Sequence, residues 1–232
     1  MHLYKYETHA HTSETSKCSK LSGAELVRFY KELGYTGLFI SDHFFNGNTT
    51  VPKDLPWAER VKLFCKGYDN AYEEGKRVGL NVFFAWEYTF NGTDLLTYGL
   101  DKEWLLSYPL LLNLDVNEYC DLVHQDGGFI AHAHPFREAG YIPMIRLFPR
   151  KVDAVEVINA SMPDEVNARA SFYSESYNLL KIAGSDTHFA NKPCLSGLQL
   201  KRRLNSTEDM TNAIKSGEAE IFTDIYFSGY HF

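Results

Sequence analysis

The chain alternates between short apolar segments and longer segments with helical spacing. Runs such as YTGLFISDH (residues 35–43) are continuously apolar, which is typical of strands buried on both faces. Between such runs, residues such as Leu26, Phe29, Tyr30 and Leu33 recur on one face of a helix. Strands that alternate with helices predict a largely parallel sheet.

The pattern predicts strands and helices along the whole chain. Strands are predicted over residues 3–9, 35–43, 80–87, 94–100, 129–134, 152–159, 181–186 and 218–223, and helices over residues 21–34, 57–78, 116–128, 163–180 and 206–217. No break in composition indicates a linker, and single α/β barrels often have this length. We therefore expect one domain over residues 1–232, an α/β barrel, closed or nearly closed, of about seven core strands.

Composition and charge narrow the functional classes. The net charge of −7 argues against a nonspecific nucleic-acid binder, although an acidic chain can still build one cationic pocket. The four cysteines are widely spaced, which favours a reducing cytoplasmic location over a disulfide framework. No run of about 18 apolar residues is present, so we expect no membrane-spanning segment.

Polar side chains gather where the predicted strands end. Six of the nine histidines, together with three carboxylates, stand at or near strand termini. They are His9, His11, His43, Glu87, Asp94, His132, His134, Asp186 and His188. In a parallel barrel the carboxyl ends of the strands share the face on which active sites are built. We therefore expect these side chains to meet there.

Three of these motifs space two side chains by two residues, as in His9 and His11. Residues i and i+2 of a strand point the same way, about 6.5 Å apart, which suits two ligands of one cation. Imidazole and carboxylate together favour Zn, Mn or Fe. A single His-x-His motif is often a surface strand or a hydrogen-bonded pair, but the joint pattern predicts a site with two or more divalent metal ions.

Several motifs resemble the PHP family, the polymerase-and-histidinol-phosphatase domain. They are HAH at 9–11, SDH at 41–43, WE at 86–87, AHPF at 133–136 and GSDTH at 184–188, in the family's order. The resemblance implies a distorted seven-stranded (β/α)7 TIM-like barrel. It also implies a centre of two or three metal ions that hydrolyses phosphoesters.

Carried over residue by residue, the resemblance assigns ligands to three ions. A first ion is assigned to His9, His11, Glu87 and Asp186. Glu87 bridges to a second ion, which His134 also binds. His43 and His188 hold a third ion.

Two positions depart from the family pattern. Asp94 stands in DLLTYG, where many relatives carry a histidine, and is assigned as a ligand of the second ion. Relatives also carry an Asp or His six to eight residues after the first histidine, where this chain has Thr15, Ser16 and Lys17. Glu14 is the nearest carboxylate and is the candidate ligand of the third ion.

Four further residues have candidate roles near the metals. Strand alternation predicts that His132 faces the same side as His134, as a substrate contact, a proton donor or a buried hydrogen-bonded histidine. Arg137 follows HPF, and its planar guanidinium suits phosphate, although it could also cap the REAGY turn. Lys17 and Lys192 are weaker phosphate-binding candidates. Asp42 could orient a histidine ligand.

The leading hypothesis is an enzyme, a metal-dependent phosphoesterase that acts on a small phosphomonoester such as histidinol phosphate or a nucleotide. Glu87, Asp186, Arg137 and His132 are the catalytic candidates. Two alternatives stay open at this point. One is a nuclease or phosphodiesterase that acts on oligonucleotide ends. The other is a metal-binding module without catalysis.

Overall fold

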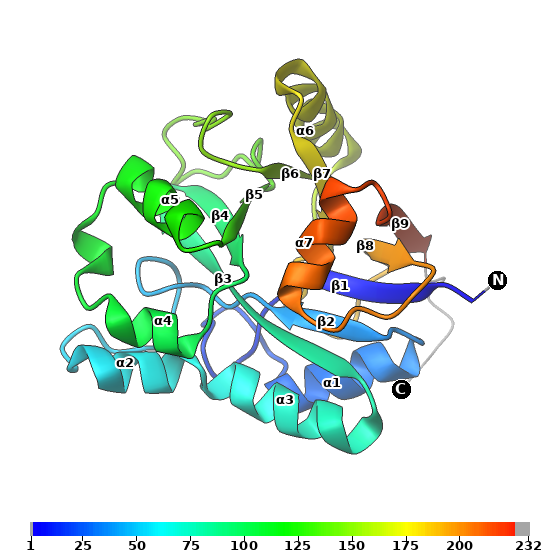
Figure 1. The fold of residues 1–232 in the computed structure, drawn as a ribbon, viewed down its shortest axis with the longest axis horizontal. Coiled ribbons are helices and arrows are strands. Elements are labelled where there is room, and N and C mark those ends of the chain that lie inside the picture. The colour runs from blue at the N-terminus through cyan, green and yellow to red at the C-terminus, as the bar shows by residue number, and fades with distance from the viewer. Residues whose placement is uncertain (1, 226–232) are drawn as a thin grey trace.

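A single curved sheet organises the molecule (Figure 1). In the computed structural model, which describes residues 2–225, nine strands pair in the order β7-β6-β5-β4-β3-β2-β1-β8-β9. The strands are β1 (Tyr4–Ala10), β2 (Gly37–Ile40), β3 (Asn81–Phe90), β4 (Thr93–Tyr98), β5 (Phe129–Ala133), β6 (Ala154–Asn159), β7 (Leu180–Gly184), β8 (Cys194–Leu200) and β9 (Glu220–Ile225).

The two sides of the sheet meet beyond the end of β7. Ala10 forms an isolated parallel bridge with Thr187, and the backbone N–H of His11 donates to the Thr187 carbonyl at 3.0 Å. Thr8 Oγ1 also donates to the carbonyl of Ala183 in β7 at 2.6 Å. The sheet is therefore a nearly closed barrel, which confirms the predicted α/β barrel class.

The strand count and directions differ from a regular (β/α)7 barrel. β4 runs antiparallel to both β3 and β5, and β8 and β9 add an antiparallel pair beside β1. The reversal at β4 comes from Asn91 and Gly92, whose φ angles are +49° and +82°. Two residues with positive φ form the tight turn that joins antiparallel strands, and Asn-Gly is the preferred pair for it.

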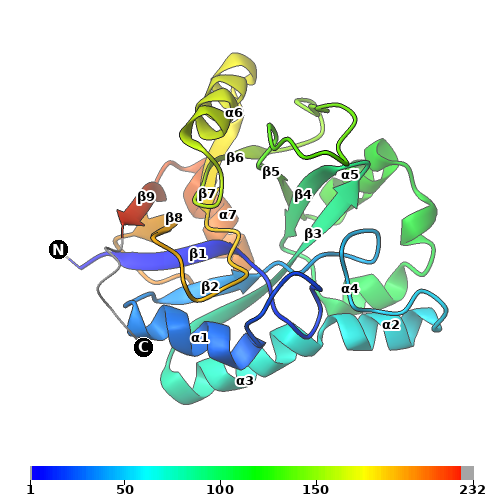
Figure 2. The same ribbon diagram turned by 180° about the vertical axis from the view of Figure 1, so that it is seen from behind.

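Helices cover the barrel on both sides. They are α1 (Gly23–Glu32), α2 (Trp57–Phe64), α3 (Lys66–Val78), α4 (Lys102–Ser107), α5 (Val116–Gln125), α6 (Asp164–Tyr177) and α7 (Thr207–Lys215). In Figures 1 and 2, α1 and α3 lie along β1–β3, whereas α6 stands on the opposite side beside β6 and β7. The predicted helix over residues 57–78 is two helices, which meet at Cys65.

The barrel interior is apolar along most of its length and polar at one end. Tyr6, Phe39, Leu96, Tyr98 and Ile182 are fully or almost fully buried and belong to one apolar cluster. The carboxyl ends of the parallel strands instead carry buried histidines and carboxylates. Among the described residues, no helix is long and apolar enough to cross a membrane.

Candidate metal centre

Seven of the side chains predicted as metal ligands converge at the carboxyl ends of the parallel strands. They are His9 and His11 at the end of β1, His43 after β2, Glu87 in β3, His134 after β5, and Asp186 and His188 after β7. Their ligand atoms form three overlapping clusters, each within 4.8 Å. The clusters are His9–Glu87–His134, His9–His11–Asp186 and His11–His43–His188.

Glu87 lies at the middle of the convergence. Its Oε1 is 3.3 Å from His9 Nε2 and 3.2 Å from His134 Nε2. Its Oε2 is 2.6 Å from His43 Nδ1 and 3.7 Å from His11 Nε2. The carboxylate is 1% exposed, so both oxygens face other ligand candidates rather than solvent. This placement suits a carboxylate shared between neighbouring cations.

Asp186 faces the same group from the opposite side of the barrel. Its Oδ1 lies 3.1 Å from His11 Nε2 and 3.6 Å from His9 Nε2. Asp186 and His134 both have left-handed backbone conformations, with φ of +52° and +26°. Such conformations are uncommon outside glycine and cluster at functional sites. Here they turn two side chains away from their strands and toward the centre.

A buried carboxylate that the sequence reasoning missed holds His9 in place. Glu156 in β6 is fully buried and accepts from His9 Nδ1, the His134 backbone N–H and Asn159 Nδ2, each at 2.9 Å. A Cβ on Gly184 would lie 2.8 Å from the same carboxylate, so glycine leaves room for it. A carboxylate on the far nitrogen of a histidine fixes its tautomer and raises its basicity as a ligand.

His11 is held by a similar chain of hydrogen bonds. Its Nδ1 lies 3.3 Å from Ser16 Oγ, which donates to Asp42 Oδ1 at 2.7 Å. Asp42 also accepts from the backbone and hydroxyl of Thr12, both at 2.6 Å. The expected role of Asp42, to orient a histidine, agrees with this geometry, with Ser16 as the intermediate.

The charges of the centre balance internally. Burial alone would lower the pKa of His9, but Glu156, Asp186 and Glu87 hold it well above its usual value. Burial alone would raise the pKa of Glu87, but His43 and His9 keep it well below its usual range. The pKa of His11 is lowered by burial and by His188 and His43. Protons on imidazoles thus supply the positive charge that these carboxylates require.

The unpaired atoms of the centre test whether metal ions fit. His9 Nε2 and His11 Nε2 are buried and have no hydrogen-bond partner, and the buried His43 Nδ1 and Glu87 Oε2 contact each other at 2.6 Å without hydrogen-bond geometry. Leaving a buried polar atom unpaired costs free energy, so such atoms are normally satisfied by a ligand or an ion. Nitrogen and carboxylate oxygen are suitable donors for Zn, Mn or Fe. The residues present therefore fit divalent metal ions.

Cys18, to which the sequence analysis gave no role at the site, lies at this centre. Its Sγ is 3.2 Å from His43 Nε2, and it is also hydrogen-bonded to His188. Burial raises the pKa of the thiol, but hydrogen bonds with His188 and His43 bring it down to about 6. The described cysteines, which are all four of the chain, are free thiols. The sequence signal for Cys18 is its position, directly after Thr15, Ser16 and Lys17, where relatives carry a ligand.

Asp94 and Arg137 bind each other, so the structure does not bring Asp94 into the ligand clusters, where it was expected at the second ion. Arg137 Nη2 donates to Asp94 Oδ2 at 2.8 Å, and Thr89 Oγ1 donates to Asp94 Oδ1 at 2.7 Å. Both carboxylate oxygens are therefore engaged, and Asp94 belongs to none of the three clusters. Arg137 Nη1 donates to Tyr141 Oη at 2.8 Å, so the guanidinium is fixed from two sides.

Glu14 does not reach the centre, so its expected role at the third ion is wrong. Its carboxylate accepts from the Gly23 backbone N–H at 3.0 Å and from Asn70 Nδ2 at 2.9 Å. Gly23 begins α1, where free N–H groups and the helix dipole favour a negative charge. Glu14 therefore stabilises the start of a helix.

His132 faces away from His134, contrary to the expectation from strand alternation. Its ring lies 6.0 Å from that of Phe148 and 5.8 Å from that of Tyr173 in α6, outside the barrel. β5 ends at Ala133, and the positive φ of His134 breaks the alternation. Burial, with a smaller effect of His134, lowers the pKa of His132 to about 3. His132 therefore lies in an apolar layer and is not among the residues that line the pocket.

The remaining basic candidates differ in their surroundings. The Lys192 ammonium donates to the carbonyl of Asp186 at 2.8 Å and also contacts Ser185 and Ser161, so it supports the loop that carries Asp186. Lys17 is exposed. Neither is as well placed for phosphate as Arg137, which lines the pocket above the centre.

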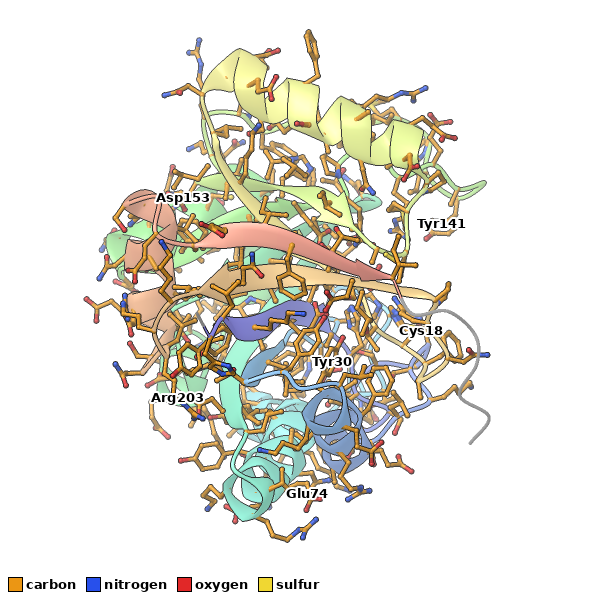
Figure 3. The ribbon with its side chains drawn as sticks, turned by 90° about the vertical axis from the view of Figure 1, so that its right-hand side faces the viewer. Cys18, Tyr30, Glu74, Tyr141, Asp153 and Arg203 are labelled. Carbon is orange, nitrogen blue, oxygen red and sulfur yellow. The ribbon has the colours of Figure 1, made fainter. Side chains whose placement is uncertain are left out.

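An open pocket of about 610 Å³ lies over the ligand clusters. Its lining includes Cys18, His43, Arg137, Tyr141, His188 and Phe189. Figure 3 shows Cys18 and Tyr141 at one end of the barrel and Asp153 and Arg203 at the other, so the pocket opens at the carboxyl ends of the parallel strands. A pocket of this size holds a small-molecule ligand.

Among the comparisons with known proteins, the one with solved structures finds matches, and these concern the fold. No protein-family model and no curated protein matches the sequence. A solved two-domain protein from Bacteroides vulgatus, which contains a predicted PHP-like metal-dependent phosphoesterase, is 15% identical with a TM-score of 0.70. That match covers 95% of this chain and 65% of the other, so this chain spans less than two thirds of that protein.

Two further solved structures cover most of both chains. PsfC from Pseudomonas syringae is 17% identical with a TM-score of 0.60, over 98% of this chain and 93% of PsfC. A proposed metal-dependent phosphoesterase from Bifidobacterium adolescentis is 16% identical with a TM-score of 0.54, over 90% of this chain and 95% of the other. The chain therefore has the fold of PHP-like phosphoesterase structures.

Proposed function

We propose that the protein is a metal-dependent phosphoesterase that hydrolyses a small phosphomonoester. The observation that carries the proposal is the convergence of unpaired, buried imidazole and carboxylate atoms beneath an open pocket. Such a set of donors has no evident structural purpose, because an apolar barrel end would be more stable. The shared fold of the PHP-like phosphoesterase structures supports the same reaction class.

The ligand candidates would form two neighbouring ion sites. His9, His11, Glu87 and Asp186 would hold one ion, and Glu87 with His134 a second. Divalent ions at such a site supply an activated water at neutral pH and neutralise charge that develops on phosphate oxygens. Glu156 and the Ser16–Asp42 pair fix the histidines, so the donors are already oriented before substrate arrives.

Arg137 gives the pocket its preference for a phosphate group. Its guanidinium stands on the pocket wall, held by Asp94 and Tyr141, and its Nε is buried without a partner. A fixed planar fork with a free donor matches phosphate oxygens. The pocket volume of about 610 Å³ suits a metabolite or nucleotide better than a folded nucleic acid.

Turnover after metal exchange tests the proposal. The protein is stripped with a chelator, reloaded separately with Mn, Zn or Fe(II), and assayed with p-nitrophenyl phosphate and with bis-p-nitrophenyl phosphate. We expect metal-dependent hydrolysis of the monoester, with the diester slower. Faster hydrolysis of the diester would favour a phosphodiesterase. Tight metal binding with no turnover of either ester, or of a panel of phosphorylated metabolites, would favour a module without catalysis.

A further inference from the structure

Cys18 stands at the edge of the centre, in the loop that follows β1. Its thiol lies between His43 and His188, and it lines the pocket. The assignments above leave it without a role. The carboxylates near the two imidazoles beside it are Glu87, which is assigned to the first two ions, and Asp186, which is assigned to the first. A third donor is therefore missing at the place where the thiol lies.

The loop is fixed around the thiol rather than free at the surface. The backbone N–H of Lys17 donates to the Asn48 carbonyl at 3.0 Å, and Ser16 forms a bridge with Thr49. Figure 2 shows this loop beside the one that follows β2. On the other side of Cys18, Ser19 Oγ donates to the His11 carbonyl and the Lys20 N–H to the His188 carbonyl, both at 2.9 Å. The residues on both sides of Cys18 are thus tied to the loops and backbone that carry the ligands.

We propose that Cys18 is a sulfur ligand of a third ion, which it holds together with His43 and His188. The inference rests on the proposed metal centre and specifies one of its positions. A second observation points to the same place. His11 is fully buried, its Nε2 has no hydrogen-bond partner, and its ligand atom lies within 4.8 Å of those of His43 and His188. An imidazole buried in this way requires an ion or a proton beside it.

The observed spacing is close to that of two ligands on one ion. Around tetrahedral zinc, bonds of about 2.3 Å to sulfur and about 2.0–2.1 Å to nitrogen place those atoms roughly 3.6 Å apart. Cys18 Sγ and His43 Nε2 are 3.2 Å apart. Opening the pair by about 0.4 Å, within the freedom of a partly buried side chain, would admit the ion.

A thiolate changes which metal this position prefers. Thiolate ligands select zinc over manganese, whereas carboxylate ligands accept manganese readily. The first two positions have nitrogen and oxygen donors, and the third would have sulfur and two nitrogens. We therefore expect the third position to take zinc from a mixture of zinc and manganese. If the thiol only hydrogen-bonds to the two imidazoles, no such preference arises.

Cobalt substitution reads the sulfur bond directly. The metal-stripped protein is titrated with Co(II), and its near-ultraviolet absorption is recorded for the parent, Cys18→Ser and the control Cys194→Ser. A sulfur-to-cobalt charge-transfer band should develop in the parent and in Cys194→Ser and be absent in Cys18→Ser. Elemental analysis should show the loss of about one ion per chain in Cys18→Ser alone.

The outcomes separate this inference from the proposed function. If cobalt binds and p-nitrophenyl phosphate is hydrolysed but no charge-transfer band forms, the sulfur ligand is wrong and the enzyme assignment stands. If the band forms as expected but no phosphoester is hydrolysed, Cys18 is a ligand and the proposed function fails. If no cobalt binds to the parent, both are overturned.

Alkylation of the parent protein avoids any effect of substitution on folding. Iodoacetamide is added with and without zinc, and the modified cysteines are located by peptide mass spectrometry. We expect zinc to slow alkylation of Cys18 at least about tenfold and to leave Cys194 unchanged, because a bound thiolate is a poor nucleophile. Equal alkylation of Cys18 with and without bound zinc would overturn the inference.

Discussion

Glu156 Oε1 accepts a hydrogen bond from His9 Nδ1 at 2.9 Å, and this single contact decides which nitrogen of His9 faces the centre. Because Nδ1 carries the proton that Glu156 accepts, Nε2 is the nitrogen that faces the centre. It lies 3.3 Å from Glu87 Oε1 and 3.6 Å from Asp186 Oδ1, where it could bind an ion. The other Glu156 oxygen holds the backbone of His134. One buried carboxylate therefore positions two ligand candidates from different strands.

Replacing Glu156 should weaken metal binding although it touches no ion. In Glu156→Gln the side chain keeps its shape, but its NH₂ group would face at least one of the three groups that now donate to the carboxylate. That hydrogen bond would be lost. Loss of such a supporting contact typically costs about 10–100-fold in metal affinity. Competition with a chromogenic zinc chelator measures this. The exposed Glu165→Gln is the matched control, and an unchanged zinc affinity in Glu156→Gln would show that the contact is not used.

Truncating the same side chain should cost stability as well. Glu156→Ala leaves the buried His9 Nδ1, His134 N–H and Asn159 Nδ2 without an acceptor. Breaking a buried charged contact costs about 3–5 kcal/mol, or roughly 6–20 °C in Tm for a domain of this size. Thermal unfolding of the metal-free protein isolates this effect. A Tm within about 2 °C of the parent would contradict it.

Glu87→Gln should abolish turnover while leaving the fold intact. An amide offers one good acceptor, whereas the Glu87 carboxylate presents Oε1 to His9 and His134 and Oε2 to His43. Because supporting contacts alone are worth about 10–100-fold, loss of a shared ligand should cost on the order of 100-fold or more in kcat. Circular dichroism should be unchanged. Near-normal kcat with full metal content would rule out the shared position.

Arg137→Ala should impair catalysis without removing metal. A charge-assisted contact to phosphate is worth about 1.5–3 kcal/mol, so kcat/KM should fall roughly ten- to hundredfold, and Arg137→Lys should recover part of it. Arg150→Ala, an exposed arginine of the same connection, should be neutral. A kcat/KM for Arg137→Ala within about twofold of the parent would leave Arg137 as a structural partner of Asp94.

Asp94→Asn separates the two roles considered for Asp94. As the partner of Arg137, the asparagine variant should keep its full metal content and its metal-activation profile. In the double variant Asp94→Asn/Arg137→Ala, part of the stability lost in Arg137→Ala should return, because the 4% exposed Asp94 carboxylate is no longer left charged and unpaired. Loss of an ion in Asp94→Asn, measured by elemental analysis, would instead make Asp94 a ligand.

The stabilisation by metal should grow with pH. Despite burial, the carboxylates raise the pKa of His9, His43 and His134, so in the metal-free protein these imidazoles stabilise the fold when charged. That contribution is complete below the unfolded pKa of about 6.5 and is lost as pH rises through the higher folded values. The pKa of His188 is raised as well, whereas the pKa of His11 is lowered, so four imidazoles of the centre act in one direction and one in the other.

At low pH the carboxylates of the centre lose their stabilising contribution. The pKa values of Glu87 and Asp186 are lowered by the histidines although burial opposes this, so their contribution is present above about pH 4 and is lost in stronger acid. Metal must displace the imidazole protons, so its apparent affinity should rise at least about tenfold per pH unit between about pH 6 and pH 8. A zinc-induced Tm shift that is the same at both pH values would contradict this.

The sequence predicted correctly those features that depend on the regular spacing of residues in strands and helices. Of the nine strand-end histidines and carboxylates that were expected to meet, seven converge, because the carboxyl ends of parallel strands share a face and residues two apart point together. The α/β barrel followed from the alternation of strands and helices. Local signals are also readable in the sequence, as at Ser22 and Glu25, which form a capping box at the start of α1.

The errors arose where the backbone leaves regular geometry or where long-range partners decide. The positive φ of His134 broke the alternation on which His132 was placed. Glu14 and Asp94 found partners far along the chain, Asn70 and Arg137, that spacing cannot show. Glu156 lies inside an apolar strand with no motif around it. The Asn91-Gly92 turn was a readable signal for the antiparallel β4, and it was missed.

The number of metal ions per chain tests the central claim most directly. The purified protein, loaded with Zn or Mn and freed of excess metal by gel filtration, is analysed by inductively coupled plasma mass spectrometry against its protein concentration. We predict about two or three ions per chain, held by the three overlapping ligand clusters. Less than about one ion per chain after loading would contradict the account, because the buried donors would then serve no cation.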